Sequence, residues 1–567
     1  MTKILFKKNW IELHADYNDK AFSNLLFNTV GVYSTSSRKV YRCSYRLLDD
    51  VLYYLRGVTD IEQLPDNVAA IVRKEKARRL ATDTIKQQGT TKTYPGLWGH
   101  QNMGVALAAV NKRYNFFYDT RTGKTRMAYQ IMLNAFNEGR VKRCIVFTPS
   151  TIIKSWLSDA EAFPQLKVVA FYGSEKEKQH ALHTPSHIVL WSTGMAVNYM
   201  DLIKRIGFDM CFFDESSKLK SYKSQTAQAI VDYSQYVEYW YNLSATPAPN
   251  GEYEYYMQMK TVDPYAFSPF ITHFNRLFFD DMSNNKAYQR LRIKPEMYQI
   301  FMSIVENKSI YVDQAVMPVA KKFWHIYDFT MCAETSEAYD KMRSDLAVEA
   351  ESTVITADTA TAMRAKLCQL TSGFVLDTDA RKENAINKKL EIDERLQTTY
   401  EIGYKDRVRA LEKLLNEIGS DEQIVIWAHY EQEFIDIAKL LSFKCKSFRV
   451  LRGGTSIADK EEAIAGFKGH KVQYLVCHPL SVGMGINLTE AHHAIYYRVT
   501  DSWEALKQSS ERIFGHITVQ PNDCHYWVLC ANLNDNRNTV DMLVYNNVSN
   551  KRDASTGFLD YLKAGVL

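Results

Sequence analysis

Short apolar runs alternate with amphipathic stretches in two separate parts of the chain. From about 95 to 265 the runs are NFFYD, RCIVFTP, VVAFYG, HIVLWST, MCFFDE and YWYNLSATP. The pattern returns from about 423 to 530 with QIVIWAH, SFRVLRG, VQYLVCHP, HAIYYRV and HYWVLCA. Such runs are typical of strands that are buried on both faces, so each part predicts a parallel sheet covered by helices. The predicted fold class is therefore α/β, with two lobes of this kind.

The rest of the chain completes a five-part organisation. Residues 1–90 mix short alternating runs with the helix-like SYRLLDDVLYYLRGV, which predicts a small α+β module. Residues 91–265 form the first lobe, 266–400 a largely helical linker or insertion, and 401–545 the second lobe. Residues 546–567 form a C-terminal tail. A chain of 567 residues is long enough for several such domains.

Composition excludes several classes of protein. The chain is 46% hydrophobic and 24% charged, as globular proteins are. It has no apolar run long enough to cross a bilayer and no charged-then-apolar leader, so we expect an intracellular protein with no membrane partner. Its nine cysteines never form a C-x-x-C pair, which predicts reduced thiols and no structural metal. The net charge of +5 permits a polyanionic partner without requiring one.

The segment FFYDTRTGKTRMA indicates an apolar strand, a turn and the start of a helix. A bound triphosphate needs inward-pointing backbone N–H groups, a lysine on its outer phosphates and a hydroxyl for Mg²⁺. After Thr122, Gly123 allows close backbone approach, Lys124 supplies the cation and Thr125 supplies the metal ligand. The full G-x-x-x-x-G-K-T pattern is incomplete, because a tyrosine occupies the first glycine position. The strand before and the helix after favour a phosphate-binding loop, and hence ATP and Mg²⁺.

A carboxylate pair ends a second apolar run, in DMCFFDESSKLK. The carboxyl end of a buried parallel strand is where α/β sheets bind ligands. There, Asp214 would hold Mg²⁺ through water, and Glu215 would orient and polarise the attacking water. Solvated acids at a strand end are the ordinary alternative. The position about 90 residues after the lysine loop favours the catalytic interpretation.

The order of GKT, DE and SAT resembles that of the superfamily-2 helicases and translocases, over about residues 95 to 535. The resemblance implies two RecA-like lobes. LWGHQ resembles the upstream glutamine motif, which implies that Gln101 reads adenine. SATP resembles the motif that couples ATP hydrolysis to translocation, which implies a coupling role for Ser244 and Thr246. SVGMGINLTEAHHAIYY resembles the fifth motif, which implies that Gly485 contacts the nucleotide.

The resemblance also implies which loops touch nucleic acid. VFTPSTIIKSW and VLWSTGM resemble segments that contact the phosphate backbone, and the fifth motif carries a further contact. The residues implied are Thr148, Ser150, Ser192, Thr193 and Thr489. Backbone contacts of this kind hold the nucleic acid without reading its sequence.

Other residues resemble the Swi/Snf-like branch of these enzymes. They are Trp156, the KLKSYKS that follows the carboxylates, Asn250, and RGGTSIADKEEAIAGFK. The compact form is most similar to phage-encoded DNA helicases of this branch. This resemblance implies translocation on duplex DNA with forks or junctions, branch migration, and a place in the cytoplasm of a bacterial host. Arg121, where many relatives have glycine, is interpreted as a variant without a role of its own.

The last motif departs from the family pattern. QSSERIFGHITVQ places Gln508 and Arg512 at the start of Q-x-x-x-R-x-x-R, but residue 515, where the second arginine belongs, is Gly515. In the family that arginine reaches the γ-phosphate. Three alternatives stay open: Arg512 stabilises the transition state alone, another residue such as Arg498 replaces the missing one, or hydrolysis is slow.

Two other enzymatic functions and one non-enzymatic function compete with a DNA motor. An RNA-dependent ATPase is opposed only by the Swi/Snf-like features, and a P-loop ATPase of another kind leaves the second lobe's motifs unexplained. The non-enzymatic alternative is a degenerate DNA-binding scaffold, which Gly515 supports and the intact Lys124, Asp214 and Glu215 oppose.

The N-terminal module admits two interpretations. It precedes the glutamine motif, so a two-lobe motor does not require it. It is either a substrate-engaging module or a structural cap. Its basic and aromatic residues are Lys7, Lys8, Trp10, Arg38, Lys39, Tyr41 and Arg42.

Overall fold

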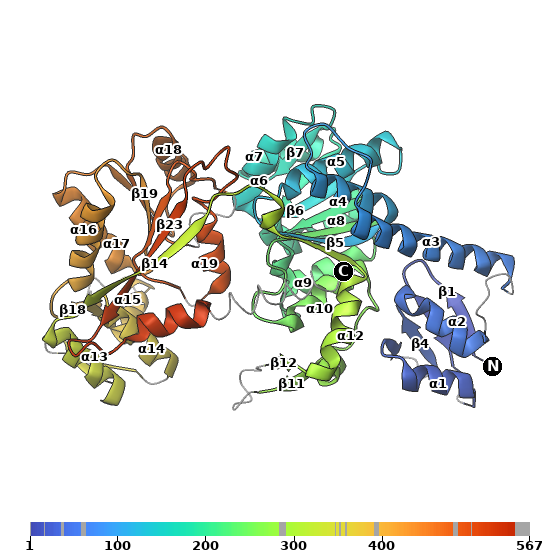
Figure 1. Ribbon diagram of the computed structural model, residues 1–567, viewed down its shortest axis with the longest axis horizontal. Helices are drawn as coiled ribbons and strands as arrows, with labels where there is room; N and C mark the ends of the chain where they lie inside the picture. Colours follow the sequence, from blue (N-terminus) through green and yellow to red (C-terminus); the bar gives the residue numbers. More distant parts are fainter. Residues whose placement is uncertain are drawn as a thin grey trace. The chain divides into compact units, whose positions relative to one another are not determined.

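The computed structural model describes residues 2–15, 18–35, 39–57, 64–282, 291–345, 347–350, 353–357, 360–389, 396–479, 486–500 and 502–549 (Figure 1). The chain divides into two compact units, which part between Met317 and Pro318. Each unit contains one parallel sheet flanked by helices. The predicted α/β class with two parallel-sheet lobes is confirmed. Among the described residues, no helix combines the length and the apolar character needed to cross a membrane.

Seven parallel strands form the sheet of the first unit, in the order β13-β5-β10-β9-β6-β8-β7. Their bounds are β5 Arg113–Tyr118, β6 Cys144–Thr148, β7 Val168–Phe171, β8 Ile188–Ser192, β9 Met210–Asp214, β10 Tyr239–Ser244 and β13 Ser309–Val312. Every residue of β5, β6, β8, β9 and β10 is buried, as the continuous apolar runs predict. Helix α4 Gly99–Val110 precedes β5. The helices between the following strands are α5 Lys124–Asn137, α6 Ile153–Ala160, α7 Glu175–His183, α8 Met200–Ile206 and α9 Gln225–Ser234, and α10 Tyr255–Val262 and α12 Pro295–Glu306 follow β10.

Six parallel strands form the sheet of the second unit, in the order β14-β23-β22-β19-β21-β20. They are β14 Lys322–Thr330, β19 Ile424–Trp427, β20 Phe448–Leu451, β21 Tyr474–Cys477, β22 His493–Tyr496 and β23 Cys524–Asn532. The accompanying helices are α16 Asp406–Ile418, α17 Glu431–Phe443, α18 Ile457–Lys468 and α19 Trp503–Ser510. Side chains alternate between two apolar cores: Val425 and Trp427 enter one, while Ile424 and Ile426 enter the other.

The segment 266–400 is divided between the two units. The first unit takes α11 Ile271–Phe278, the hairpin of β11 Phe279–Asp281 with β12 Leu291–Ile293, and then α12 and β13. The second takes β14, α13 Ala333–Asp345, β15 Ala347–Ala350, β16 Thr353–Thr356, α14 Ala360–Leu370, β17 Phe374–Leu376, α15 Thr378–Lys389 and β18 Thr399–Glu401. The segment is largely helical, as expected, but β13 and β14 are edge strands of the two parallel sheets. Each pairs with a strand about 200 residues away, so local pattern could not assign them.

The N-terminal module is a small antiparallel sheet with two helices, as predicted. Strands β1 Lys3–Phe6, β2 Ile11–His14, β3 Val32–Ser34 and β4 Val40–Cys43 lie in the order β1-β2-β4-β3, beside α1 Lys20–Asn28 and α2 Leu48–Arg56. The module is docked onto the first lobe by polar contacts. Arg42 donates to the Tyr265 hydroxyl at 2.7 Å, and Ser44 donates to the Asp263 carboxylate. The Arg42 guanidinium also lies 5.0 Å from the ring centroid of Trp10.

The basic run RKEKARR lies in α3 Asp66–Gln88, which follows the module. Arg78 and Arg79 both pair with Glu75, at 2.7 and 3.2 Å. Asp49 of α2 binds Arg79 at 2.8 Å and Lys76 at 3.4 Å. Much of the run therefore holds α3 against its neighbours, as a solvated or structural face would, and it does not form a bare cationic patch.

Arg42 gives a test of how the module is held. We expect Arg42→Ala to weaken the docking by about 1–2 kcal/mol, because the guanidinium loses its bonds to Glu12 and Tyr265. The measurement is hydrogen exchange in the full chain, where amides of β2 and β4 should exchange faster. Lys39→Ala, at an exposed position of the same module, is the matched control. Equal exchange in both variants would contradict this account of the docking.

Candidate active site

Apart from the glutamine motif, which lies at the start of α4, the motifs predicted for the first lobe follow the carboxyl ends of parallel strands. β5 ends at Tyr118, β6 at Thr148, β8 at Ser192, β9 at Asp214 and β10 at Ser244. Because the strands run parallel, these ends lie along one edge of the sheet. The structure therefore gathers the lysine loop, the carboxylate pair and the SAT turn at the edge where α/β sheets bind ligands.

The loop after β5 has the backbone expected of a phosphate-binding turn. Gly123 has φ +74°, and a Cβ there would come within 2.0 Å of Gln101 Nε2, so only glycine fits. The Nζ of Lys124 donates to the carbonyl oxygens of Tyr118 at 2.9 Å and Asp119 at 3.1 Å, which draws the ammonium inside the loop. Arg121 also has a left-handed φ, +64°. The position that is glycine in many relatives thus keeps a backbone that favours glycine.

Gln101 supports the loop from α4. Its Oε1 accepts from the Trp98 N–H at 2.8 Å, and its Nε2 donates to the carbonyls of Thr122 at 3.2 Å and Gly123 at 3.0 Å. His100 donates to the same Thr122 carbonyl at 2.8 Å. The amide thus fixes the backbone of the phosphate loop, and its implied recognition of adenine stays a prediction. The Thr122 hydroxyl is also internal, donating to the carbonyl of Asp119 at 2.7 Å.

The Asp214 carboxylate is the most constrained charged group of the site. It is 6% exposed. Its Oδ2 accepts from Trp156 Nε1 at 2.8 Å and from the Thr148 hydroxyl at 3.2 Å, and its Oδ1 accepts from the Glu215 N–H at 3.0 Å. Burial raises the pKa of Asp214, and the Trp156 bond, the Lys124 charge and the Thr148 bond oppose that rise.

Glu215 has a left-handed backbone, with φ +54°. A non-glycine residue in that region is strained by about 1–3 kcal/mol and persists only where the surroundings enforce it. The surroundings here are tight, because Ser216 donates to Gln258 Oε1 at 2.7 Å directly after the turn. The left-handed backbone at Glu215 ends the extended course of β9, at the carboxyl edge of the sheet.

The oxygen groups present fit Mg²⁺, which prefers carboxylate, hydroxyl and water ligands. Asp214 has roughly four lone-pair positions, three of which accept the hydrogen bonds described above, so its Oδ1 can still accept from a metal-bound water. Thr125 stands in the first turn of α5, immediately after Lys124. Asp214 and Thr125 stay the predicted ligands of the ion.

The residues predicted to touch nucleic acid differ in their exposure. Ser150 is exposed, directly after Pro149. Thr148 is 0% exposed, and its hydroxyl is bonded to Asp214, so the structure places it in the carboxylate site instead of at the tip of the loop. Ser192, Thr193 and Thr489 are buried. The nucleic-acid contacts stay a prediction.

Gln258 of α10 is a site residue that the sequence did not indicate. It is fully buried and links two motifs. Its Oε1 accepts from Ser216 after the carboxylate pair, and its Nε2 donates to the carbonyl of Pro247 at 2.6 Å, after the SAT turn. Within that turn, the Ser244 hydroxyl accepts from the Thr246 N–H at 3.2 Å. A lone glutamine in a helix carries no sequence signal for this role.

Arg498 is excluded as a substitute for the missing arginine. It is 6% exposed, and its guanidinium is bound on every side within the second unit. Its Nε donates to Glu433 at 2.9 Å and its Nη1 to Asp541 at 3.1 Å, while Nη2 donates to Thr371 at 2.8 Å and Ser372 at 2.9 Å. The arginine charges hold the pKa values of Glu433 and Asp541 below their usual range despite burial.

Arg512, the arginine present in the last motif, is partly exposed to solvent. It is half-buried, and its Nη1 donates to the carbonyl of Ile486 at 3.4 Å. Gln508 is also half-buried, with Nε2 donating to Glu504 at 3.4 Å. At Gly515 a Cβ would lie 3.2 Å from Thr489 Cγ2, closer than side chains normally pack. Gly485 lies outside the described residues.

The helicase conserved C-terminal domain matches residues 406–514, and the SNF2-related domain matches residues 68–387, more than half of the chain. The chain belongs to the SNF2-related family. Members of this superfamily-2 family are nucleic-acid-dependent ATPases, and this protein is one of them, with the nucleotide as its energy source.

Relatives of the SNF2-related chain come from phage and animals. It is 22% identical over 431 residues to protein p41 of Acyrthosiphon pisum secondary endosymbiont phage 1, covering 71% of this chain and 84% of that protein. It is 19% identical over 480 residues to the DNA repair and recombination protein RAD54B of Gallus gallus, covering 78% of this chain. The chain spans 51% of that protein's length, so it matches about half of it. Among solved structures, the Sulfolobus solfataricus SWI2/SNF2 ATPase core in complex with dsDNA is 15% identical, with a TM-score of 0.36, covering 77% of this chain and 88% of that one.

A group of metal-ligating side chains lies apart from the SNF2 motifs. Ligand atoms of Glu422, His492 and His493 lie within 4.8 Å of one another, at the amino ends of β19 and β22. His493 Nδ1 accepts from Trp527 Nε1 at 3.1 Å, and burial with neighbouring histidines lowers the His493 pKa to about 4. The neutral ring therefore carries its proton on Nε2, which leaves that nitrogen no lone pair for a metal. The group fits a hydrogen-bonded cluster better than a metal site.

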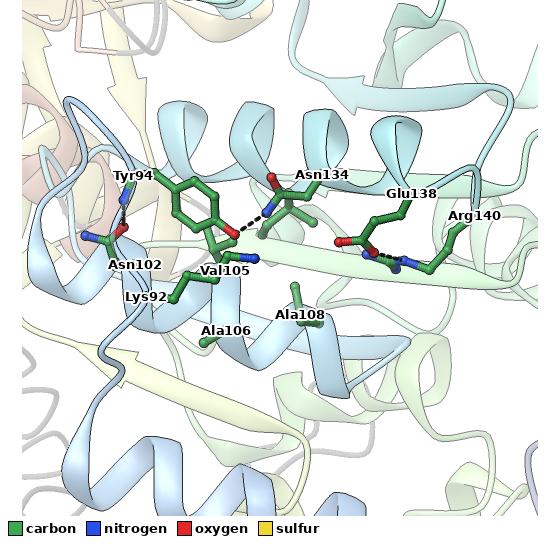
Figure 2. Close-up of a pocket in the computed structure, with 11 residues that line it drawn as sticks. Lys92, Tyr94, Asn102, Val105, Ala106, Ala108, Asn134, Glu138 and Arg140 are labelled. Atoms are coloured by element: carbon green, nitrogen blue, oxygen red, sulfur yellow. Dashed lines mark hydrogen bonds and ion pairs between the residues drawn. The ribbon is translucent and has the colours of Figure 1, made fainter.

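A small pocket opens between α4 and α5 (Figure 2). Its volume is about 50 Å³, and Tyr94, Asn134, Glu138 and Arg140 are among its lining residues. The Asn134 amide donates to the Tyr94 hydroxyl at 2.7 Å across it. The pocket has room for one or two water molecules and contains none of the predicted site residues, so it is not the nucleotide site.

Two arginine variants separate structural from catalytic roles in the second unit. We expect Arg498→Ala to destabilise that unit by about 3–5 kcal/mol, because the buried Glu433 would lose its paired arginine charge and Asp541 would keep only that of Arg407. Arg512→Ala should fold normally but lower ATP turnover at least ~10²-fold, with less effect on nucleotide binding, because the charge acts mainly in the transition state. Thermal unfolding and phosphate release measure the two effects. A stable Arg498→Ala protein that loses turnover selectively would contradict the assignment.

Proposed function

We propose that this protein is an ATP- and Mg²⁺-dependent DNA translocase that remodels forked or branched DNA by branch migration. The observation that carries the catalytic part is the buried Asp214 carboxylate, held by three hydrogen bonds at the sheet edge that also bears Lys124. Family membership supports the use of a nucleotide and a nucleic acid.

Each residue of the first unit has a distinct task in this proposal. The backbone around Gly123 and the Lys124 ammonium bind the phosphates, and the present bonds of Lys124 to two carbonyls are the ones it exchanges for phosphate oxygens. Asp214 and Thr125 hold Mg²⁺, which when bound neutralises the charge on the transferring phosphate. Glu215 orients the attacking water and accepts its proton.

The family resemblance implies that Gln508 and Arg512 of the second unit act in ATP hydrolysis. Arg512 stabilises the charge that develops on the transferring phosphate, as the family resemblance implies. The confinement of Arg498 by Glu433, Asp541 and two hydroxyls supports this choice between the two arginines. Slow hydrolysis, the third alternative, would show as a low rate that Arg512→Ala lowers further.

Branched DNA is the proposed substrate because of an energy balance. A motor that tracks along a duplex without a strand-splitting domain does useful work where each broken base pair is replaced by a new one. The net cost is then near zero, whereas plain unwinding loses about 1.4 kcal/mol of stacking per step. The name of RAD54B refers to DNA repair and recombination, where such exchange occurs, and supports the choice of DNA over RNA.

The N-terminal module has features of both interpretations. Its docking through Ser44 and Arg42 supports the structural cap, and Arg42 is already engaged. Lys7 and Lys39 are exposed and remain the proposed DNA-engaging charges, while Arg38 lies outside the described residues. Deleting the module would uncover Asp263, so charge reversal at Lys7 and Lys39 is the cleaner way to examine DNA binding.

Two variants test the nucleotide site. Lys124→Ala should abolish turnover and weaken nucleotide binding, and Glu215→Gln should bind ATP without hydrolysing it, since the base is lost but the charge pattern at Lys124 is kept. The measurements are DNA-stimulated phosphate release and binding of a fluorescent ATP analogue. Glu238→Gln is the matched control and should keep full turnover, because Glu238 is a half-buried carboxylate paired with Lys112 just before the amino end of β10. Undiminished activity of pure Lys124→Ala would reject the site, and a scaffold would show no turnover in the native protein.

The substrate is tested by comparing branched and plain DNA of equal length. We expect ATP-driven conversion of a mobile four-way junction or fork to be faster than unwinding of a blunt duplex. Binding should weaken steeply with salt and depend little on sequence, because phosphate contacts dominate it. Equal rates on junction and duplex would reject the preference for branches, and stimulation by RNA alone would favour the RNA-dependent ATPase.

A further inference from the structure

The second unit has one long strand at the margin of its sheet. Strand β14 is the last strand in the order of that sheet and pairs with β23 over all nine of its residues (Figure 1). The other edge strands of the two parallel sheets, β7, β13 and β20, have four residues each. Because an edge strand offers its backbone to other chains, proteins commonly keep such strands short. β14 is therefore the edge at which a further strand can form the most backbone hydrogen bonds.

Alternate residues of β14 direct their backbone groups away from the sheet. The Lys321 carbonyl accepts from the Cys524 N–H at 2.8 Å, and the Met331 N–H donates to the Asn532 carbonyl at 2.9 Å. The odd-numbered residues thus bond to β23. Because these directions alternate along an extended chain, residues 322, 324, 326, 328 and 330 point their N–H and C=O groups outward. In the part of the chain that the structure describes, no hydrogen bond reaches these outward groups.

The side chains of β14 include uncovered apolar groups and a charge toward each end. Phe323 is 40% exposed and Ile326 is 42% exposed. Lys322 begins the strand and is paired with Glu511. Asp328, near the other end, is exposed, and among the described residues its carboxylate forms no ion pair. The strand therefore has opposite charges at its two ends and apolar side chains between them.

Two copies of β14 bring these unlike charges together when they lie antiparallel. With His325 opposite its counterpart in a second copy, Lys322 of each chain lies opposite Asp328 of the other, twice by symmetry. Even-numbered residues then lie opposite even-numbered ones, so the outward backbone groups bond in pairs. Parallel pairing in register would instead set Lys322 and Asp328 each against its own copy, and like charges directly opposite are destabilising.

The same register covers the exposed apolar side chains. Ile326 lies opposite Trp324 of the second copy on one face, and Phe323 lies opposite Tyr327 on the other face. Aromatic pairs and pairs of an aromatic with a β-branched residue are favourable across strands. Moving the symmetry axis by one residue, to Ile326, would set Trp324 against the charged Asp328. Charge and apolar burial therefore favour the register centred on His325.

We propose that β14 is the interface of a two-fold symmetric homodimer, in which two chains pair their β14 strands antiparallel and join the sheets of their second units into one. This mode of association adds a strand to an exposed sheet edge, with the affinity coming from main-chain hydrogen bonds. Nine residues from each chain are fewer than the ~20–30 of a standard interface, so the dimer dissociates reversibly.

Two variants and a matched control test the interface in the full chain. Sedimentation velocity over a wide range of protein concentration should show a reversible monomer–dimer equilibrium. We expect Ile326→Lys and Asp328→Lys each to raise the dimer dissociation constant at least ~10-fold, because each places extra positive charge where the strands meet. Ile435→Lys is the control, since Ile435 of α17 is also an isoleucine of the second unit and is 39% exposed. It should dimerise as the native protein does.

A disulfide cross-link tests the register. In an antiparallel pair without mutual hydrogen bonds the two Cα atoms lie about 4.5 Å apart, within reach of a disulfide. In a Cys445→Ser background, which removes the exposed cysteine, His325→Cys should give a covalent dimer on mild oxidation, and Ile326→Cys should not. Hydrogen exchange should slow in a peptide covering β14 as the protein concentration rises.

Several results would overturn the inference. One is a monomer at every concentration, and another is a dimer that Ile326→Lys and Asp328→Lys leave as strong as Ile435→Lys does. Cross-linking through Ile326→Cys in place of His325→Cys would reject the register. Slow exchange of β14 in the monomer would show that the chain covers this edge itself. Thermal unfolding confirms that each variant is folded, and Asp328→Lys, a change at an exposed position, carries the test if Ile326→Lys does not fold.

Discussion

The parallel alignment of the strands in the first unit is the constraint on which the candidate active site depends. Parallel strands bring all their carboxyl ends to one edge, and β9 lies between β10 and β6 in that sheet. Asp214 consequently stands beside the end of the strand that carries the SAT turn and the end of the strand that carries Thr148. An antiparallel arrangement of the same runs would separate these residues by the length of a strand.

The buried Asp214 carboxylate requires hydrogen-bond donors and a positive charge around it. A carboxylate removed from water is costly unless hydrogen bonds and opposite charge replace its hydration. Trp156, Thr148 and the Glu215 N–H supply the bonds, and Lys124 supplies the charge. Two residues with left-handed backbones adjoin these charges in the chain: Arg121 stands three residues before Lys124, and Glu215 directly follows Asp214. This is consistent with strain being concentrated where function requires a particular geometry.

Burial distinguishes Arg498 from Arg512 in the second unit, although the sequence offered both as candidates for the role of the missing arginine. Arg498 is enclosed by Glu433, Asp541 and two hydroxyls, and Arg407 shares Asp541 and Thr371 with it. Such a buried set of charges holds α14, α17 and the strands together, and cannot release one member without leaving another unpaired. Arg512 is only half-buried. The missing arginine at Gly515 coincides with a close approach of Thr489, whose carbonyl, with those of Ala491 and Ile513, is held by Gln520.

The sequence by itself determined the α/β class, the two parallel sheets and the order of the lysine, carboxylate and SAT motifs. Each of these features is recognised from short segments of five to seven neighbouring residues. The sequence also indicated Gly123 and Lys124, whose roles follow from local backbone and charge. Only the tertiary structure decided that β13 and β14 belong to different sheets, that Arg498 is structural, and that Gln258 and Trp156 connect the motifs. Each of these depends on contacts between residues from 11 to more than 200 positions apart, which hydrophobic periodicity does not encode.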